Sequence, residues 1–137
     1  MTIENALDVY LRTDATLMNL IGGGTVPSLT VARLYWMQAP EGCTLPYVVF
    51  TMVSDTDQQE FFSAANAGQG RAQFDVVGTS RANKNIEERI RTLLRHYRGT
   101  LSGLVINAIY PINRRERFNA DTGRYVFSAD YEVHCEY

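Results

Sequence analysis

The sequence predicts an α+β fold, in which an antiparallel β-sheet of about four to five strands packs with an N-terminal helical segment and one long helix on one face. The last segment, residues 124–137, alternates apolar and polar residues, as in a strand with one buried and one solvated face. Residues 80–99 instead repeat apolar residues at helical spacing. Helices come first, then strands, a helix and further strands, and this grouping is typical of the α+β class.

Residues 2–21 are predicted to form two helices. Apolar residues recur at helical spacing after Thr2, whose side chain is placed to cap the first exposed amides. Thr13 and Asp14 interrupt this helix and cap a second, short one. Three consecutive glycines, residues 22–24, end that helix because glycine accepts the backbone conformation a stop requires. They do not form a phosphate-binding loop, since such a loop follows a strand and precedes a helix.

Two strands are predicted next. Residues 32–37 form a short strand, and Pro46 opens a second strand that runs to about Ser54 and is rich in β-branched and aromatic residues. The polar and small residues of the segment Asp55–Gly70 predict a long loop or a flexible hairpin tip. Loops of that length are often functional, so this segment is a candidate binding surface.

A third strand, Arg71–Thr79, leads into the main helix. Ser80 is placed to cap this helix and Gly99 to end it. Its apolar stripe forms one face, and charged residues, Glu87 among them, are expected on the solvent side. His96 is expected in the last turn, where a cation interacts favourably with the helix dipole.

Two further strands complete the predicted sheet. The fourth covers Leu104–Ile112, a basic hairpin tip covers Asn113–Gly123, and the last strand covers Arg124–Tyr137. The face of the last strand that begins at Tyr125 is apolar, and the opposite face is almost wholly polar. The sequence shows no repeat, low-complexity segment or second domain, so we expect residues 1–137 to form a single domain.

Composition and charge argue against several classes of protein. The chain has 137 residues and a formal net charge of −2, without the basic excess of a nucleic-acid-binding surface. No apolar run approaches the roughly 20 residues that cross a bilayer, and the first residues lack the features of a signal peptide, so we expect a soluble cytoplasmic protein. Cys43 and Cys135 have no nearby Cys or His partner, which favours free thiols over a disulfide or a metal site.

The sequence offers no set of catalytic residues. His96 and His134 are the only histidines. His134 stands between Glu132 and Glu136 on the polar face of the last strand, and no nucleophile accompanies it, so solvated neighbours are favoured over an acid–base pair. Asp130 and these glutamates are spaced too widely along one strand to converge on one ion. We therefore expect no enzyme activity, no cofactor and no metal.

The candidate interface residues lie in two segments. Phe61 and Phe62 stand side by side in the predicted loop, where both cannot face one side of a strand, so one of them needs cover from the chain itself or from another subunit. The hairpin is basic, which suits an acidic partner surface, a solvated edge that resists aggregation or, less favoured, a nucleic-acid backbone. Its arginines are Arg114, Arg115, Arg117 and Arg124.

Five segments, spread over almost the whole chain, stand in a characteristic order and spacing. They are the second helix from Asp14-Ala15-Thr16-Leu17 to the glycines, Leu45-Pro46-Tyr47-Val48-Val49-Phe50, Arg71-Ala72-Gln73-Phe74-Asp75-Val76, Tyr97-Arg98-Gly99-Thr100-Leu101 and Asp121-Thr122-Gly123-Arg124-Tyr125. This ordered set resembles the small tail-completion, or tail terminator, proteins of long-tailed bacteriophages.

The resemblance implies a structural protein of a phage or prophage that acts by assembly, without catalysis or a cofactor. Such a protein is a subunit of a ring, commonly a hexamer, that caps the tail tube and joins the tail to the neck of the head. The implied partners are other copies of the chain, the tail tube protein and a connector or stopper protein of the neck. The implied locations are the host bacterial cytoplasm during assembly and then the virion.

No specific nucleic-acid binding is implied, although the lumen of such a ring can pass DNA. The alternatives are another structural adaptor protein of the neck or tail and, less favoured, a small nucleic-acid-binding module.

Overall fold

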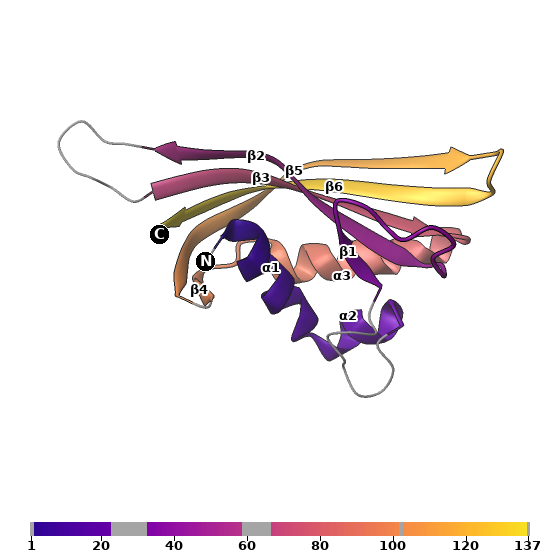
Figure 1. Ribbon diagram of the computed structural model, residues 1–137, viewed down its shortest axis with the longest axis horizontal. Helices are drawn as coiled ribbons and strands as arrows, with labels where there is room; N and C mark the ends of the chain where they lie inside the picture. The colour runs from indigo at the N-terminus through magenta and orange to yellow at the C-terminus, as the bar shows by residue number, and fades with distance from the viewer. Residues whose placement is uncertain (1, 23–32, 59–66, 102, 137) are drawn as a thin grey trace.

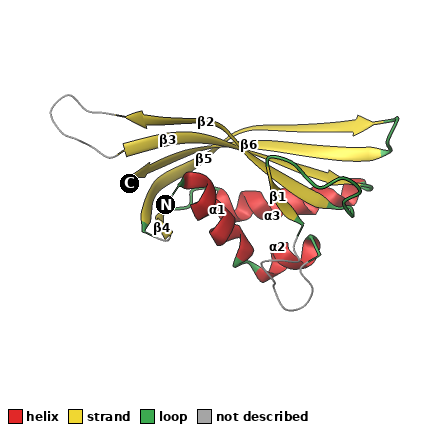
Figure 2. Ribbon diagram, in the orientation of Figure 1, coloured by secondary structure: helices red, strands yellow, loops and turns green. Residues whose placement is uncertain are grey.

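A mixed sheet with helices on one face forms the structure (Figure 1, Figure 2). The computed structural model describes residues 2–22, 33–58, 67–101 and 103–136. Within them the elements are α1 (Ile3–Arg12), α2 (Ala15–Leu20), β1 (Leu34–Trp36), β2 (Tyr47–Gln58), β3 (Ala67–Gly78), the 3-10 helix η1 (Arg81–Asn83), α3 (Lys84–Leu94), β4 (Gly99–Leu101), β5 (Leu104–Asn119) and β6 (Arg124–Glu136). The six strands lie in the order β1-β2-β3-β6-β5-β4.

The α+β class is confirmed, but the expected four to five antiparallel strands are replaced by six strands in a mixed sheet. β1 pairs with β2 in parallel, with Trp36 opposite Phe50. Residues 37–46 carry the chain back to the start of β2, so β1 and β2 run in the same direction instead of in the antiparallel sense predicted for the sheet. β4 was not expected, because it begins at Gly99, the residue predicted to end the helix.

The predicted loop Asp55–Gly70 is largely strand. β2 continues to Gln58, β3 begins at Ala67, and pairs such as Asp55 with Gly70 extend the ladder. Backbone hydrogen bonds need no apolar side chain, so the polar composition of this segment did not prevent pairing. Phe61 and Phe62 lie outside the described residues.

The main helix is shorter than predicted. Ser80 caps η1, and the eleven residues of α3 follow and end at Leu94. His96 therefore lies beyond the helix, with a left-handed φ of 58°, and its backbone N–H donates to the carbonyl oxygen of Ile109 at 3.0 Å. The prediction that His96 sits in the last helical turn is wrong, because the chain already turns there toward β4.

The core lies between the helices and one face of the sheet. β6 contributes alternate residues to this face, from Phe127 to Cys135, as its alternating sequence predicted. Phe74 of β3 lies at the centre, with its ring stacked on Phe50 at a centroid distance of 4.8 Å and edge-on to Tyr131 at 5.8 Å. Burial of these aromatic rings together with the apolar faces of the helices stabilises the fold.

Both predicted caps of the N-terminal helices are confirmed. The Thr2 hydroxyl accepts from the backbone N–H of Asn5 at 3.3 Å, and the Asp14 carboxylate accepts from that of Leu17 at 2.8 Å. Asp14 also accepts two hydrogen bonds from Arg89 of α3, at 2.9 and 2.6 Å. These bonds lower the pKa of Asp14 and tie the start of α2 to the middle of α3.

We expect Asp14→Ala to lower the free energy of unfolding by about 2 kcal/mol at pH 7, since it removes both a helix cap and an ion pair. Because the folded pKa lies below the ordinary value of 3.8, the contribution of Asp14 is present above that value and is lost as the pH falls through the folded pKa. Denaturant titrations at pH 7 and pH 3 check this. Asp14→Asn, which keeps a capping oxygen, should lose less at pH 7, and an Asp14→Ala deficit equal at both pH values would contradict the ion-pair account.

Candidate assembly interface

Exposed large apolar side chains gather on the two opposite edges of the sheet. Among the described residues, seven of the eight such side chains lie there. Trp36, Met37 and Val53 belong to the β1–β2 edge, and Val105, Tyr110, Ile112 and Phe118 belong to β5. Only Val9, on α1, lies elsewhere. Exposed apolar side chains along the edges of a sheet are candidates for contact with other proteins.

Each of these edges also has unpaired backbone. β1 covers only the start of β2, so residues 51–58 have no described strand on their outer side. β4 covers only Leu104–Ile106 of β5, and the backbone N–H of His96 donates to the carbonyl oxygen of Ile109, so residues 110–119 have no described strand on their outer side. An edge with free N–H and C=O groups accepts a further strand unless the protein blocks it. The two open edges lie at opposite sides of the sheet and differ in sequence.

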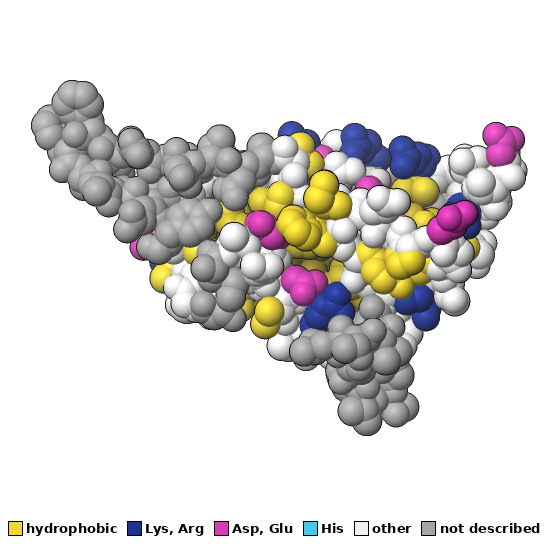
Figure 3. Space-filling view, in the orientation of Figure 1, with side chains coloured by type: hydrophobic (Ala, Val, Ile, Leu, Met, Phe, Trp, Pro, Cys, Tyr) yellow, Lys and Arg dark blue, Asp and Glu magenta, His cyan; other side chains and the backbone are white. Residues whose placement is uncertain are grey.

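The β5–β6 hairpin forms one end of the molecule along its long axis (Figure 1). Arg115, Arg117 and Arg124 are exposed and form no ion pair with any residue that the structure describes. Arg115 and Arg117 lie opposite Ser128 and Val126, on the sheet face that the helices leave uncovered. Basic side chains are visible along that side in Figure 3.

Arg114 differs from these three arginines because it is held within the chain. Its guanidinium donates to both carboxylate oxygens of Glu87, at 3.0 and 2.5 Å. Glu87 was expected on the solvent side of the helix, but its side chain is only 3% exposed, against 38% for Arg114. The hydrogen bonds that Arg114 donates to the Glu87 carboxylate raise the pKa of Arg114. The pair fastens β5 to α3, since β5 extends over the helix further than predicted.

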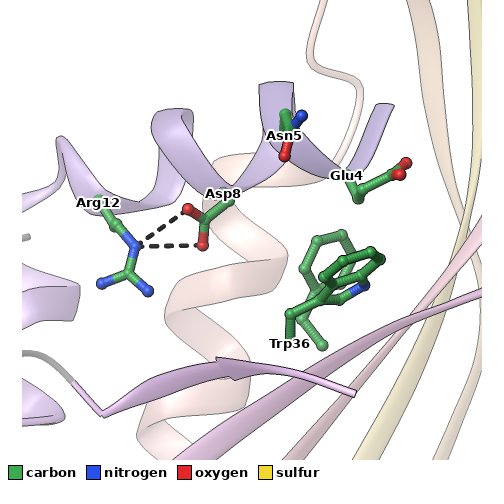
Figure 4. A pocket seen from close by; sticks show the side chains of 6 residues that line it. Glu4, Asn5, Asp8, Arg12 and Trp36 are labelled. Atoms are coloured by element: carbon green, nitrogen blue, oxygen red, sulfur yellow. Dashed lines mark hydrogen bonds and ion pairs between the residues drawn. The ribbon is translucent and has the colours of Figure 1, made fainter. Parts of the chain in front are cut away.

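A shallow pocket of about 180 Å³ opens between α1 and β1 (Figure 4). Its lining residues are Glu4, Asn5, Asp8, Arg12, Trp36 and Phe50. The Arg12 Nε donates to both oxygens of Asp8 at 3.1 Å, while its Nη2 donates to the carbonyl oxygen of Leu34 at 2.7 Å. The volume falls below the roughly 300–1,000 Å³ of small-molecule sites, so the pocket suits a side chain rather than a cofactor.

Sequence analysis missed Trp36, the only tryptophan of the chain. Its side chain is 58% exposed, on the same strand face as the buried Leu34. It is exposed because the core ends there: the neighbouring Met37 already leaves the strand with a φ of 67°. Two large apolar residues, Trp36 and Met37, stand directly before a turn, and this was the signal in the sequence that could have identified the exposed surface.

The uncovered face of the sheet holds a polar network. The Asp130 carboxylate accepts from Arg71 at 2.7 Å, and the Ser128 hydroxyl donates to Asp75 at 2.5 Å. Ser128 and Asp130 are buried, so the polar face of the last strand is less solvated than predicted. Neighbouring long side chains on β3 cover them, which the pattern of one strand does not reveal.

The other groups considered for chemistry show no catalytic arrangement in the described residues. Glu132 accepts a hydrogen bond from Gln69 and lies 3.3 Å from Nε2 of His134. No group of described His, Cys, Asp and Glu residues is arranged to hold a metal ion. Cys43 and Cys135 form no disulfide with each other, and the buried Cys135 thiol donates to the carbonyl oxygen of Gly68 at 3.6 Å. None of the described helices has the length and apolar character needed to cross a membrane.

Two solved structures share the fold of this chain, and one family model matches its sequence. The chain resembles a component of the virion of a native gene transfer agent particle, with a TM-score of 0.73 and 16% identity over 98% of this chain and 95% of that one. A second solved structure shares the fold, with a TM-score of 0.65 and 12% identity over 98% and 93% of the two chains. No curated protein sequence matches. The model of the family "Tail completion protein gp17" matches residues 5–136, and the chain therefore belongs to this family of structural tail completion proteins of phages.

Proposed function

We propose that this protein is a tail terminator, which forms a ring of six copies, caps the tail tube and joins the tail to the neck of the head. The family match over residues 5–136 carries this proposal. The similarity to a chain of a gene transfer agent virion supports a place in a tail-like particle. The protein acts by stoichiometric assembly in the host cytoplasm and remains in the virion, with DNA passing through the lumen of the ring.

The distribution of the exposed apolar residues supports a ring. A ring needs two different patches on each subunit, since each copy contacts one neighbour through one patch and the other neighbour through the second. The β1–β2 edge and β5 provide two such patches. A twofold dimer would pair one patch with itself and leave the other exposed, so it accounts for only half of the apolar surface.

Light scattering coupled to size-exclusion chromatography, followed by negative-stain imaging, tests the proposal. We expect a species of about six chain masses with a central hole, and we expect it to bind one end of purified tail tubes. Tubes already capped by the protein serve as the control and should bind no more. A chain that stays monomeric at all concentrations and does not bind tubes would refute the ring. Binding to neck proteins alone would instead favour the adaptor alternative.

A further inference from the structure

The two apolar edges complement each other in direction as well as in character. The four long strands alternate in direction across the sheet, so β5 runs opposite to β2 within one copy. A second copy related by rotation about a ring axis roughly parallel to the strands keeps this direction. Its β5 therefore meets β2 of the first copy in the antiparallel sense, and the helices of both copies stay on the same side of the joined sheet.

We propose that residues 112–119 of one copy add as a strand to residues 51–58 of the next copy, with Phe118 packing on Trp36 beside the α1–β1 pocket. The proposal rests on the ring of the proposed function and specifies its subunit contact. The occupant of the Trp36 surface is thus a second copy of the chain.

The antiparallel direction determines which ends meet. β2 runs away from Trp36 toward Gln58, because Trp36 lies opposite Phe50. In an incoming β5 laid antiparallel to it, Ile112 lies near Gln58 and the last residues, Phe118 and Asn119, lie next to Thr51 and Trp36. A parallel arrangement would place these residues at the far end of β2.

The side chains face the same way. Trp36 shares its strand face with Leu34, which is buried under the helices. Phe118 lies opposite Tyr125, and Tyr125 packs against the core, so Phe118 also lies on the helix side of the sheet. Both rings are more than half exposed in the single copy, at 58% and 55%. Their contact would bury both, and the pocket beside Trp36 has room for a side chain.

Disulfide cross-linking tests this contact. The two residues lie four strands apart across one chain, about 19 Å at roughly 4.8 Å per strand, which is beyond the reach of a disulfide. In a Cys43→Ser background, a chain carrying both Trp36→Cys and Phe118→Cys should form a reductant-sensitive ladder of covalent multimers up to the ring size. A mixture of the two single substitutions should stop at dimers. Val9→Cys with Phe118→Cys is the matched control and should not form a ladder.

The single tryptophan provides a second readout that needs no disulfide. Trp36 emission should shift to shorter wavelength as the wild-type protein assembles, and Phe118→Asp should abolish the shift and weaken assembly by about tenfold or more. Val9→Asp should leave both unchanged. A wild-type ring without a 36–118 ladder, or with an equal ladder from the Val9 control, overturns the contact and leaves the ring intact. A wild-type monomer refutes the proposed function itself.

Discussion

Replacing Phe74 by alanine is expected to lower the free energy of unfolding by about 3–5 kcal/mol. Phe74 is fully buried at the centre of the sheet, stacked on Phe50 and edge-on to Tyr131. The substitution removes the transfer free energy of the ring and leaves a cavity that two aromatic neighbours on paired strands cannot easily fill. A domain of this size is stable by only about 5–15 kcal/mol, so the variant should unfold at a much lower denaturant concentration.

Equilibrium denaturation at one low protein concentration measures this loss. Phe118→Ala is the matched control: it removes the same side chain from the same sheet, but at a position that is 55% exposed, so the change should stay within about 0.5 kcal/mol. A loss below about 1 kcal/mol for Phe74→Ala would mean that the ring contributes little to the core.

Arg114→Ala is expected to cost about 3 kcal/mol, because it leaves the carboxylate of Glu87 buried without its partner. This is the low end of the range for buried ion pairs, since Arg114 is itself 38% exposed and water partly screens the interaction. Arg114→Lys keeps the charge but loses the two-pronged hydrogen bonding, so an intermediate loss is expected.

The double variant Glu87→Leu with Arg114→Leu separates the pair from its surroundings. It removes both charges together, and we expect its stability to lie within about 1 kcal/mol of the wild type. Thermal denaturation of the two single variants and the double variant forms the cycle. Single losses that simply add in the double variant would show that the two residues do not act as a pair. Because the pair fastens β5 to α3, the single Arg114 variant should also weaken any assembly that uses β5.

The sequence predicted the secondary structure best where the pattern within a single strand or helix is sufficient to define it. The alternation from Tyr125 onward gave β6 and its buried face, and the capping residues Thr2 and Asp14 gave the starts of α1 and α2. These patterns depend on neighbours along the chain. Local hydrogen bonding and side-chain periodicity are therefore sufficient to predict them.

Features that depend on a distant segment were missed. The helical pattern places Glu87 on the solvent side of α3. In the structure Arg114 covers it, because β5 runs further than expected. The parallel pairing of β1 depends on the path of residues 37–46, which no periodicity encodes. The exposure of Trp36 depends on where the core ends, and that position is set by the packing of α1 against the sheet.

The arginines of the hairpin remain candidate interface residues, with one distinction that the structure adds. Arg115, Arg117 and Arg124 are exposed, whereas Arg114 already has a partner within the chain. The contact proposed through β5 gives the apolar residues of that strand the main role. Arg115 and Arg117 belong to the strand that would add to the next copy, but their side chains lie on the helix-free face, opposite to Phe118.

The shape of the sheet depends on the positions of its irregularities. The register shifts at Val53 in β2 and at Asn107 and Ile112 in β5, whereas the central β3–β6 pair is regular throughout. Each extra residue bends its strand and increases the local twist, whatever its side chain. The curvature of β2 and β5 therefore depends more on the number of residues in each strand than on which residues they are. Deleting one of these three residues should flatten an edge that substitutions there would leave curved.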